Sequence, residues 1–203
     1  MPVIVLDTNV LFDSPMLTSH EWESLIENRM AWDLQIVIPD VVVMETGTIV
    51  KREWSKTKDS VNSLRVGGLG LKPEKENLAA MIQSRIDGYE DALANRIESA
   101  GIVVEPVPAV DHLAIARRAS LDRAPYAGGT KDGYRDTLIW LTLLSVADQS
   151  HDEEIWFVSN NTLDFGPTKG DWTGPKNGTR ESCPILFHSH LREELESLSL
   201  IHI

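Results

Sequence analysis

Five short apolar runs in this chain alternate with longer stretches of helical periodicity, and this alternation constrains the fold more than any other feature. Each run has the length and the apolar composition of a buried strand. The runs are residues 2–6, 34–38, 102–105, 155–159 and 185–188. Strands that alternate with helices favour a parallel sheet covered by helices on its faces. We therefore predict an α/β protein with a central, mainly parallel sheet.

The stretches between these runs carry the spacing of amphipathic helices. We predict helices that begin near residues 19 and 40 and further helices over 73–100, 111–121, 134–147 and 192–198. Gly101 is expected to stop the long helix that starts at Pro73. The 203 residues suit a single domain, and the region around 56–100 is the candidate for a helical insertion into it.

Composition excludes several classes of protein. The chain is 42% apolar and 25% charged, which is enough apolar material for a globular core. None of its apolar runs approaches the roughly 20 residues that span a bilayer, and no basic stretch precedes the first run as in a secretory signal. A single cysteine excludes an internal disulfide and a cysteine zinc site. We expect a soluble cytoplasmic protein.

The charges are unevenly placed. The net charge of −12 argues against non-specific coating of nucleic acid. However, 15 of the 19 Lys and Arg residues fall within 51–75, 114–135 and 169–180. Each of these segments adjoins one of the acidic positions described next. The pattern fits a basic rim that holds a phosphate backbone, and it fits ordinary solvated helix faces equally well.

Four carboxylates lie where packing alone would not place them. Asp7 ends the first apolar run, and Glu45 lies among valines and methionine on the helix after the second run. Asp136 is in the first turn of a very apolar helix, and Asp164 follows the fourth run. Singly, these residues could stabilise a helix start or a turn. Because ligands bind at the carboxyl ends of parallel strands, we expect the four side chains to meet there.

A cluster of carboxylates requires a compensating cation. Two unit charges about 4 Å apart repel by roughly 4 kcal/mol at an effective dielectric near 20. Oxygen ligands without cysteine favour Mg²⁺ or Mn²⁺. Such an ion activates water and stabilises charge on a phosphoryl oxygen, so phosphodiester hydrolysis is the natural chemistry.

Four sequence motifs resemble those of PIN-domain ribonucleases, in the same order. They are Asp7-Thr8-Asn9, Glu45 on a helix, Arg135-Asp136-Thr137-Leu138-Ile139-Trp140, and Val158-Ser159-Asn160-Asn161-Thr162-Leu163-Asp164-Phe165. The resemblance extends from residue 1 to about 190 and is closest to the larger, poorly characterised bacterial PIN-like proteins. It implies a three-layer α/β/α fold with a central parallel sheet. It also implies Mg²⁺- or Mn²⁺-dependent endonucleolytic cleavage of single-stranded or structured RNA.

The resemblance also implies roles for individual residues. The catalytic and metal-binding carboxylates would be Asp7, Glu45, Asp136 and Asp164. Asn161 stands where the family often has Asp, and it would ligate through its amide oxygen or hold a water. Asn9 and Ser159 match polar residues that support the metal ligands by hydrogen bonds.

Further residues are candidates for contact with RNA. These are Arg135, Lys131, Lys51, Arg52 and Trp172. Arg135 either contacts a phosphate or pairs with an acid, and Trp172 either stacks on a base or anchors its own loop. An antitoxin or a second copy of the chain would be the protein partner.

Two other functions fit parts of the pattern. A Mg²⁺-dependent phosphatase of the haloacid-dehalogenase type also uses an Asp at a strand end, as its nucleophile. Such enzymes usually carry a second Asp two residues later, and this chain has Asn9 there. A non-catalytic PIN-like binding or toxin–antitoxin protein is favoured by Asn161 and by the acidic total charge.

Overall fold

A parallel sheet of four strands forms the centre of the computed structural model, which describes residues 1–126, 132–150, 153–161, 164–166 and 189–197. The spatial order is β3-β2-β1-β4, and every neighbouring pair is parallel. The strands are β1 (Val3–Leu6), β2 (Gln35–Pro39), β3 (Val103–Glu105) and β4 (Ile155–Val158). The predicted α/β class with a parallel sheet is confirmed. The strand predicted at 185–188 lies outside the described residues.

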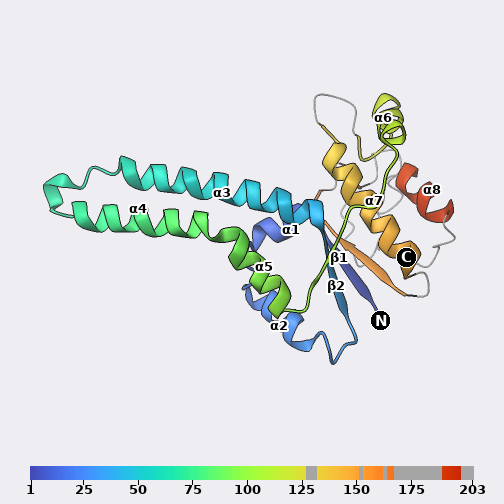
Figure 1. Cartoon of the computed structure of the whole chain (residues 1–203), viewed down its shortest axis with the longest axis horizontal. Helices are drawn as coiled ribbons and strands as arrows, with labels where there is room; N and C mark the ends of the chain where they lie inside the picture. Colours follow the sequence, from blue (N-terminus) through green and yellow to red (C-terminus); the bar gives the residue numbers. More distant parts are fainter. Residues whose placement is uncertain (127–131, 151–152, 162–163, 167–188, 198–203) are drawn as a thin grey trace, which may run out of the picture.

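Helices cover both faces of this sheet and give the predicted three layers. In Figure 1, α1, α2 and α5 lie on one side, and α7 lies on the other with α6 and α8 beyond it. The helices are α1 (Thr8–Asp13), α2 (His20–Asn28), α3 (Asp40–Ser63), α4 (Lys72–Asp87), α5 (Tyr89–Ser99), α6 (His112–Ser120), α7 (Tyr134–Gln149) and α8 (Ser189–Ser197). Within the described residues, none of these helices is both long and apolar enough to cross a membrane.

The hydrophobic core lies between the central strands and the two helical layers. Val5 in β1, Ile38 in β2, Leu11 in α1 and Trp140 in α7 are all fully buried. Burial of each such side chain contributes about 1.5–3 kcal/mol. The core therefore fixes the carboxyl ends of β1 and β2 and the start of α7 relative to one another.

The helical region before Gly101 differs from the prediction. The single helix predicted over 73–100 is wrong, because the chain breaks at Gly88 into α4 and α5. The break turns α5 onto the body of the protein, where Tyr89 and Leu93 are buried. Gly101 ends this helical region as predicted. Its φ of +60° is a conformation that residues other than glycine rarely adopt. The short helix α1 was not predicted.

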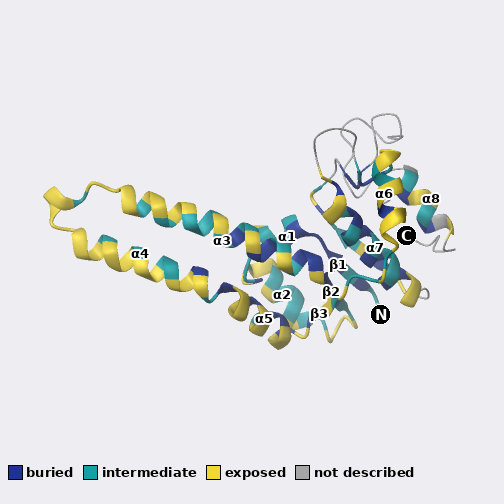
Figure 2. Ribbon diagram, turned by 45° about the horizontal axis from the view of Figure 1, so that its top comes forward, coloured by how far each residue is buried: buried dark blue, intermediate teal, exposed yellow. Residues whose placement is uncertain are grey.

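Residues 51–85, here called the arm, project from the body as a pair of antiparallel helices (Figure 1). The arm consists of the outer part of α3, a short 3₁₀ turn at Gly67–Leu69, and most of α4. Not one of the residues 51–85 is buried, whereas Val41, Val42 and Val50 at the inner end of α3 are (Figure 2). α3 has 24 residues and is therefore about 36 Å long. It connects the body to the tip of the arm.

A network around Glu194 fastens α6 and α8 to the outer side of α7. Both carboxylate oxygens of Glu194 accept hydrogen bonds from Arg118 at 2.6 Å, and Arg123 Nε donates to Oε1 at 2.9 Å. Trp140 Nε1 donates to Oε2 at 2.8 Å. Because Trp140 belongs to α7, this network supports the helix that carries Asp136.

Candidate active site

The strand order creates a switch point beside β1. The chain passes from β1 to β2 and β3 in one direction and then returns to place β4 on the other side of β1. In open α/β sheets, ligands bind outside the carboxyl ends of the strands at such a point. Asp7 directly follows β1 and Ser159 directly follows β4, so both side chains lie at this edge.

Asp7 is held by three donors and is almost completely buried, at 2% exposure. Its Oδ1 accepts the backbone N–H of Thr8 at 2.6 Å, so Asp7 also caps α1. Its Oδ2 accepts Asn9 Nδ2 at 2.7 Å and the Ser159 hydroxyl. Burial raises the pKa of Asp7 above 3.8 despite these hydrogen bonds, and the charge of Glu45 raises it further. The hydrogen bonds from Ser159, Thr8 and Asn9 therefore do not offset the cost of burying the ionised Asp7 side chain.

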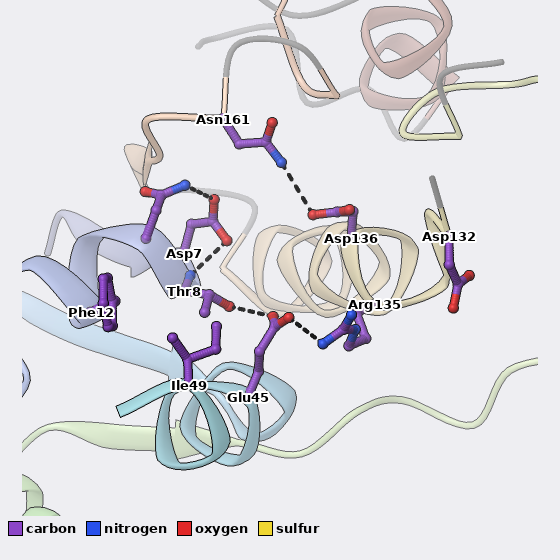
Figure 3. Close-up of a pocket in the computed structure, with 10 residues that line it drawn as sticks. Asp7, Thr8, Phe12, Glu45, Ile49, Asp132, Arg135, Asp136 and Asn161 are labelled. Carbon is purple, nitrogen blue, oxygen red and sulfur yellow. Dashed lines mark hydrogen bonds and ion pairs between the residues drawn. The ribbon is translucent and has the colours of Figure 1, made fainter. Parts of the chain in front are cut away.

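Glu45 projects from the inner end of α3 toward Asp7 and α7 (Figure 3). Its Oε2 accepts the Thr8 hydroxyl at 2.8 Å, and its Oε1 pairs with Arg135 at 2.5 Å. The side chain of Glu45 is 15% exposed, whereas that of Arg135 is 51% exposed. An ion pair with so exposed a partner is weak, so Arg135 can be displaced from Glu45.

Asn161 bridges two further carboxylates. Its amide nitrogen donates to Asp136 Oδ1 at 3.2 Å and to Asp164 Oδ2 at 2.7 Å. Its backbone N–H donates to the Ser159 hydroxyl at 2.9 Å, which ties it to the group around Asp7. Asp136 is half-buried in the first turn of α7, where the positive end of the helix dipole favours an anion. Asp164 is 2% exposed.

A cavity of about 440 Å³ opens between these groups. Four carboxylates line it: Asp7 after β1, Glu45 in α3, Asp136 in α7, and Asp132 just before α7. Its lining consists of Asp7, Thr8, Asn9, Phe12, Glu45, Ile49, Asp132, Arg135, Asp136 and Asn161. Among the described residues that line it, Arg135 is the one basic side chain. Four carboxylates against one guanidinium give the lining an excess of negative charge.

The donor set of this cavity fits a hard divalent cation, because carboxylate, amide and hydroxyl oxygens surround it and cysteine is absent from the lining. The side chains are not arranged as a finished ligand shell. Among the described residues, no group of three or more His, Cys, Asp or Glu is positioned to hold a metal ion. The oxygens of Glu45 are instead engaged by protein groups, Oε2 by the Thr8 hydroxyl and Oε1 by Arg135.

The structure thus brings together some of the residues singled out in the sequence and separates others. Asp7, Glu45, Asp136, Asn161, Asn9 and Arg135 line the cavity, and Ser159 lies directly behind Asp7. Asp164 contacts Asn161 but is not part of the lining.

The remaining candidates for RNA contact lie elsewhere. Lys51 is not part of the cavity lining and pairs with Glu90 of α5 at 2.7 Å. Arg52 is exposed on the arm, where it pairs with Glu53 at 3.2 Å. Lys131 and Trp172 lie outside the described residues.

Sequence reasoning missed Thr8, Phe12 and Asp132. Thr8 and Phe12 belong to α1, which the apolar pattern after Asp7 was too short to indicate. Asp132 lies outside α7, two residues before its start, so helical spacing does not link it to Asp136.

Comparison with known proteins identifies the family. A family model described as a PIN domain matches residues 4–165 of the chain. The chain belongs to the PIN domain family. The predicted resemblance is therefore confirmed. No curated protein and no solved structure was found that matches the chain.

Membership of the PIN domain family indicates a nuclease-type function in general. The matched region contains every carboxylate of the cavity and Asp164 as well. PIN-domain nucleases generally use divalent metals, in agreement with the excess of carboxylates around the cavity.

Proposed function

We propose that this PIN-domain protein is a divalent-metal-dependent endoribonuclease. The observation that carries the proposal is the convergence of Asp7, Glu45 and Asp136, from three distant parts of the chain, on one acidic cavity at the switch point of the sheet. A carboxylate as buried as Asp7 is costly unless a cation joins it. RNA is the proposed substrate.

Asp7, Glu45 and Asp136 would hold Mg²⁺ or Mn²⁺ in this proposal. The ion would supply a nucleophilic water near neutral pH and would stabilise charge on the phosphodiester. Asn9 and Ser159 fix the orientation of the Asp7 carboxylate through the hydrogen bonds that they donate to Oδ2. A cation bound by Glu45 would compete with Arg135, and the guanidinium would then be available to a phosphate oxygen of the substrate.

For Asn161 and Asp164 we propose a supporting role rather than direct ligation. The amide nitrogen of Asn161 lies between two carboxylates, where only a donor is compatible with both of them. Asp164 holds the amide in this orientation, because its own backbone N–H donates to Asn161 Oδ1 at 3.4 Å. Asn161 therefore positions Asp136 without adding charge.

The variant Asn161→Asp tests this role. It places a carboxylate between Asp136 and Asp164, so we expect the metal-free protein to lose about 1–3 kcal/mol of its free energy of unfolding. Mn²⁺ should restore most of that loss, since the added charge strengthens the attraction for a cation. Urea denaturation with Mn²⁺ and with EDTA measures both quantities. Asn95→Asp, the same change at an exposed position of α5, is the control, and an equal loss there would contradict the bridging role.

Two alternative functions predict different results in the RNA cleavage assay that follows. The pairing of Glu45 with Arg135 favours a non-catalytic PIN-like binding or toxin–antitoxin protein, because it occupies a proposed ligand. A phosphatase that uses Asp7 as its nucleophile is disfavoured, because both oxygens of Asp7 accept hydrogen bonds and the carboxyl group is buried.

The deciding experiment incubates the purified chain with a mixed RNA pool in Mn²⁺ or in EDTA. We expect internal cleavage in Mn²⁺, none in EDTA, and none with an Asp136→Asn variant purified in parallel. Cleavage that persists in EDTA or in the variant contradicts the proposal. RNA binding without cleavage supports the non-catalytic alternative, and a phosphorylated protein intermediate supports the phosphatase. Size-exclusion chromatography of the same sample tests for a second copy of the chain.

We also propose that residues 1–203 form one PIN-like domain and that the arm is an insertion into it. The helical segment expected around 56–100 divides into two parts with different surroundings. Its outer part belongs to the arm, whereas Tyr89, Leu93 and Ile97 of α5 are buried in the core. In this proposal the insertion ends near residue 85.

A further inference from the structure

The arm is not explained by the stability of the fold. None of its residues is buried, and helices without a buried apolar face gain little from tertiary packing. α3 and α4 contact each other along the arm (Figures 1 and 2). Contacts with α5 are made at the base of the arm, where Lys51 pairs with Glu90 and Trp54 packs on Tyr89. A segment of this kind is retained for a contact with another molecule.

The charge of the arm is opposite to that of the whole chain. Residues 51–75 contain seven Lys and Arg but only three Asp and Glu, in a chain of net charge −12. A basic segment on an acidic protein attracts polyanions to that segment and repels them from the rest of the surface. Charge therefore favours nucleic acid as the partner of the arm.

The helical period of α3 directs part of this charge toward the cavity. Glu45 and Ile49 both line the cavity. Residues seven and eleven positions after Glu45 lie on the same face of the helix, and these are Arg52 and Lys56. One continuous face thus carries the acidic site at its inner end and two cations farther out, with Lys56 about 16 Å from Glu45 along the axis.

Both cations are available to a ligand. The side chains of Arg52 and Lys56 are 62% and 65% exposed, and both pair with the single carboxylate of Glu53. One carboxylate shared between two cations leaves a positive charge uncompensated, and exposed ion pairs of this kind contribute little. Asp59 lies about one turn beyond Lys56, so the cationic part of this face ends there.

We propose that the face of α3 from Ile49 to Lys56 is a track for the RNA strand next to the cleavage site, with Arg52 and Lys56 binding its phosphate groups. The proposal rests on the proposed nuclease function and adds the direction in which the substrate leaves the cavity. Contacts to phosphates hold a strand in register without reading its sequence. The track therefore strengthens binding of RNA that extends beyond the cavity, whatever its sequence.

Two exposed arginines away from the track, Arg85 of α4 and Arg192 of α8, supply a matched control. Trp54 is nine residues after Glu45 and thus half a turn around the helix. It lines a separate groove together with Met81 and Arg85. Arg85 is exposed and belongs to the base of the arm, yet it lies on the side away from the track. Arg192 is exposed and belongs to α8, which lies at the end of the body away from the arm (Figure 1).

The test compares Arg52→Glu/Lys56→Glu with Arg85→Glu/Arg192→Glu, which change the net charge equally. RNA binding is measured in EDTA by fluorescence anisotropy over a range of salt concentrations, with a long oligonucleotide and with one shortened on one or the other side of the cleavage site. We expect the track variant to bind long RNA about tenfold more weakly, with a salt slope lower by about 1.4 for two lost phosphate contacts. The control variant should bind nearly as tightly as the wild type.

Cleavage in Mn²⁺ separates the track from the nuclease function. The track variant should have a higher KM for long RNA and nearly the same kcat. It should cleave RNA shortened on the track side nearly as well as the wild type does. Equal weakening in both double variants overturns the track and leaves the nuclease proposal intact. So does a track variant that changes only the oligomeric state, which would assign the arm to a protein contact. A wild type that neither binds nor cleaves RNA overturns both.

Discussion

Asp7→Asn should reduce metal-dependent RNA cleavage by more than about 100-fold without unfolding the protein. Loss of a group that merely orients a metal ligand costs about 10- to 100-fold, so loss of the most buried carboxylate in the cavity should cost more. The amide keeps the shape of Asp7 and can still accept from Thr8 or Ser159, so the local fold is retained. Initial rates on a defined RNA in Mn²⁺, with circular dichroism as the check on folding, measure this effect.

The same variant should make the metal-free protein more stable at neutral pH. The pKa of Asp7 is raised in the folded state, chiefly by burial, so its ionised form opposes folding. A raised carboxyl pKa adds stability below the unfolded value near 3.8, and that stability is lost as the pH rises through the folded value. The advantage of Asn over Asp at position 7 should therefore grow with pH from about 4 and then level off. Denaturation in EDTA across this range measures it.

Mn²⁺ should reverse the order of stability, because only the wild type gains a full ligand set for the cation. An Asp7→Asn protein that cleaves RNA at the normal rate would remove Asp7 from the proposed site. A variant that is less stable than the wild type in EDTA at every pH would show that the hydrogen bonds of Asp7 outweigh its burial.

The sequence predicted the sheet and the location of the cavity because both depend on local patterns. Apolar runs of strand length mark β1, β2, β3 and β4 without ambiguity. Asp7 and Ser159 follow directly on β1 and β4, so their meeting at the edge of the sheet is a consequence of parallel strand order alone. Asp136 lies in the first turn of the apolar helix α7, as the pattern predicted, and that turn reaches the same cavity.

The remaining features depend on contacts that no local pattern contains. The pairing of Arg135 with Glu45 joins α7 to α3 across 90 positions of sequence, and a charge next to Asp136 does not reveal which acid it contacts. The direction of the arm depends on the break at Gly88. The sequence did not predict this break, because the apolar positions before and after it keep one helical period. Asp164 is buried beside Phe165, whose ring packs against Phe157 of β4, and no local pattern contains that contact.

Glu194→Gln should destabilise the protein more than most single substitutions remote from the cavity. Arg118 is only 10% exposed, and the substitution leaves its guanidinium without a counter-ion in a largely buried position. Removal of one member of a buried ion pair costs about 3–5 kcal/mol, and the partial exposure of Glu194 and Arg123 reduces the expected loss to about 2–3 kcal/mol at neutral pH. Urea denaturation of the wild type and the variant measures this loss.

The loss should depend on pH in a defined direction. Burial alone would raise the pKa of Glu194, but hydrogen bonds from Arg118, Arg123 and Trp140 outweigh burial and hold the pKa below its ordinary value of 4.5. A lowered carboxyl pKa contributes stability above about 4.5, and this contribution disappears as the pH falls through the folded value. The difference between wild type and Glu194→Gln should therefore be constant near neutral pH and shrink in acid.

Glu193→Gln is the matched control, because Glu193 is 61% exposed and pairs with the partly exposed Arg123 at 3.2 Å. The control should change the free energy of unfolding by less than about 1 kcal/mol. Equal effects of the two substitutions would mean that α6, α7 and α8 are held together by apolar packing and not by this carboxylate. A larger effect at Glu194 would make the network a support of α7, the helix that carries Asp136 and Arg135.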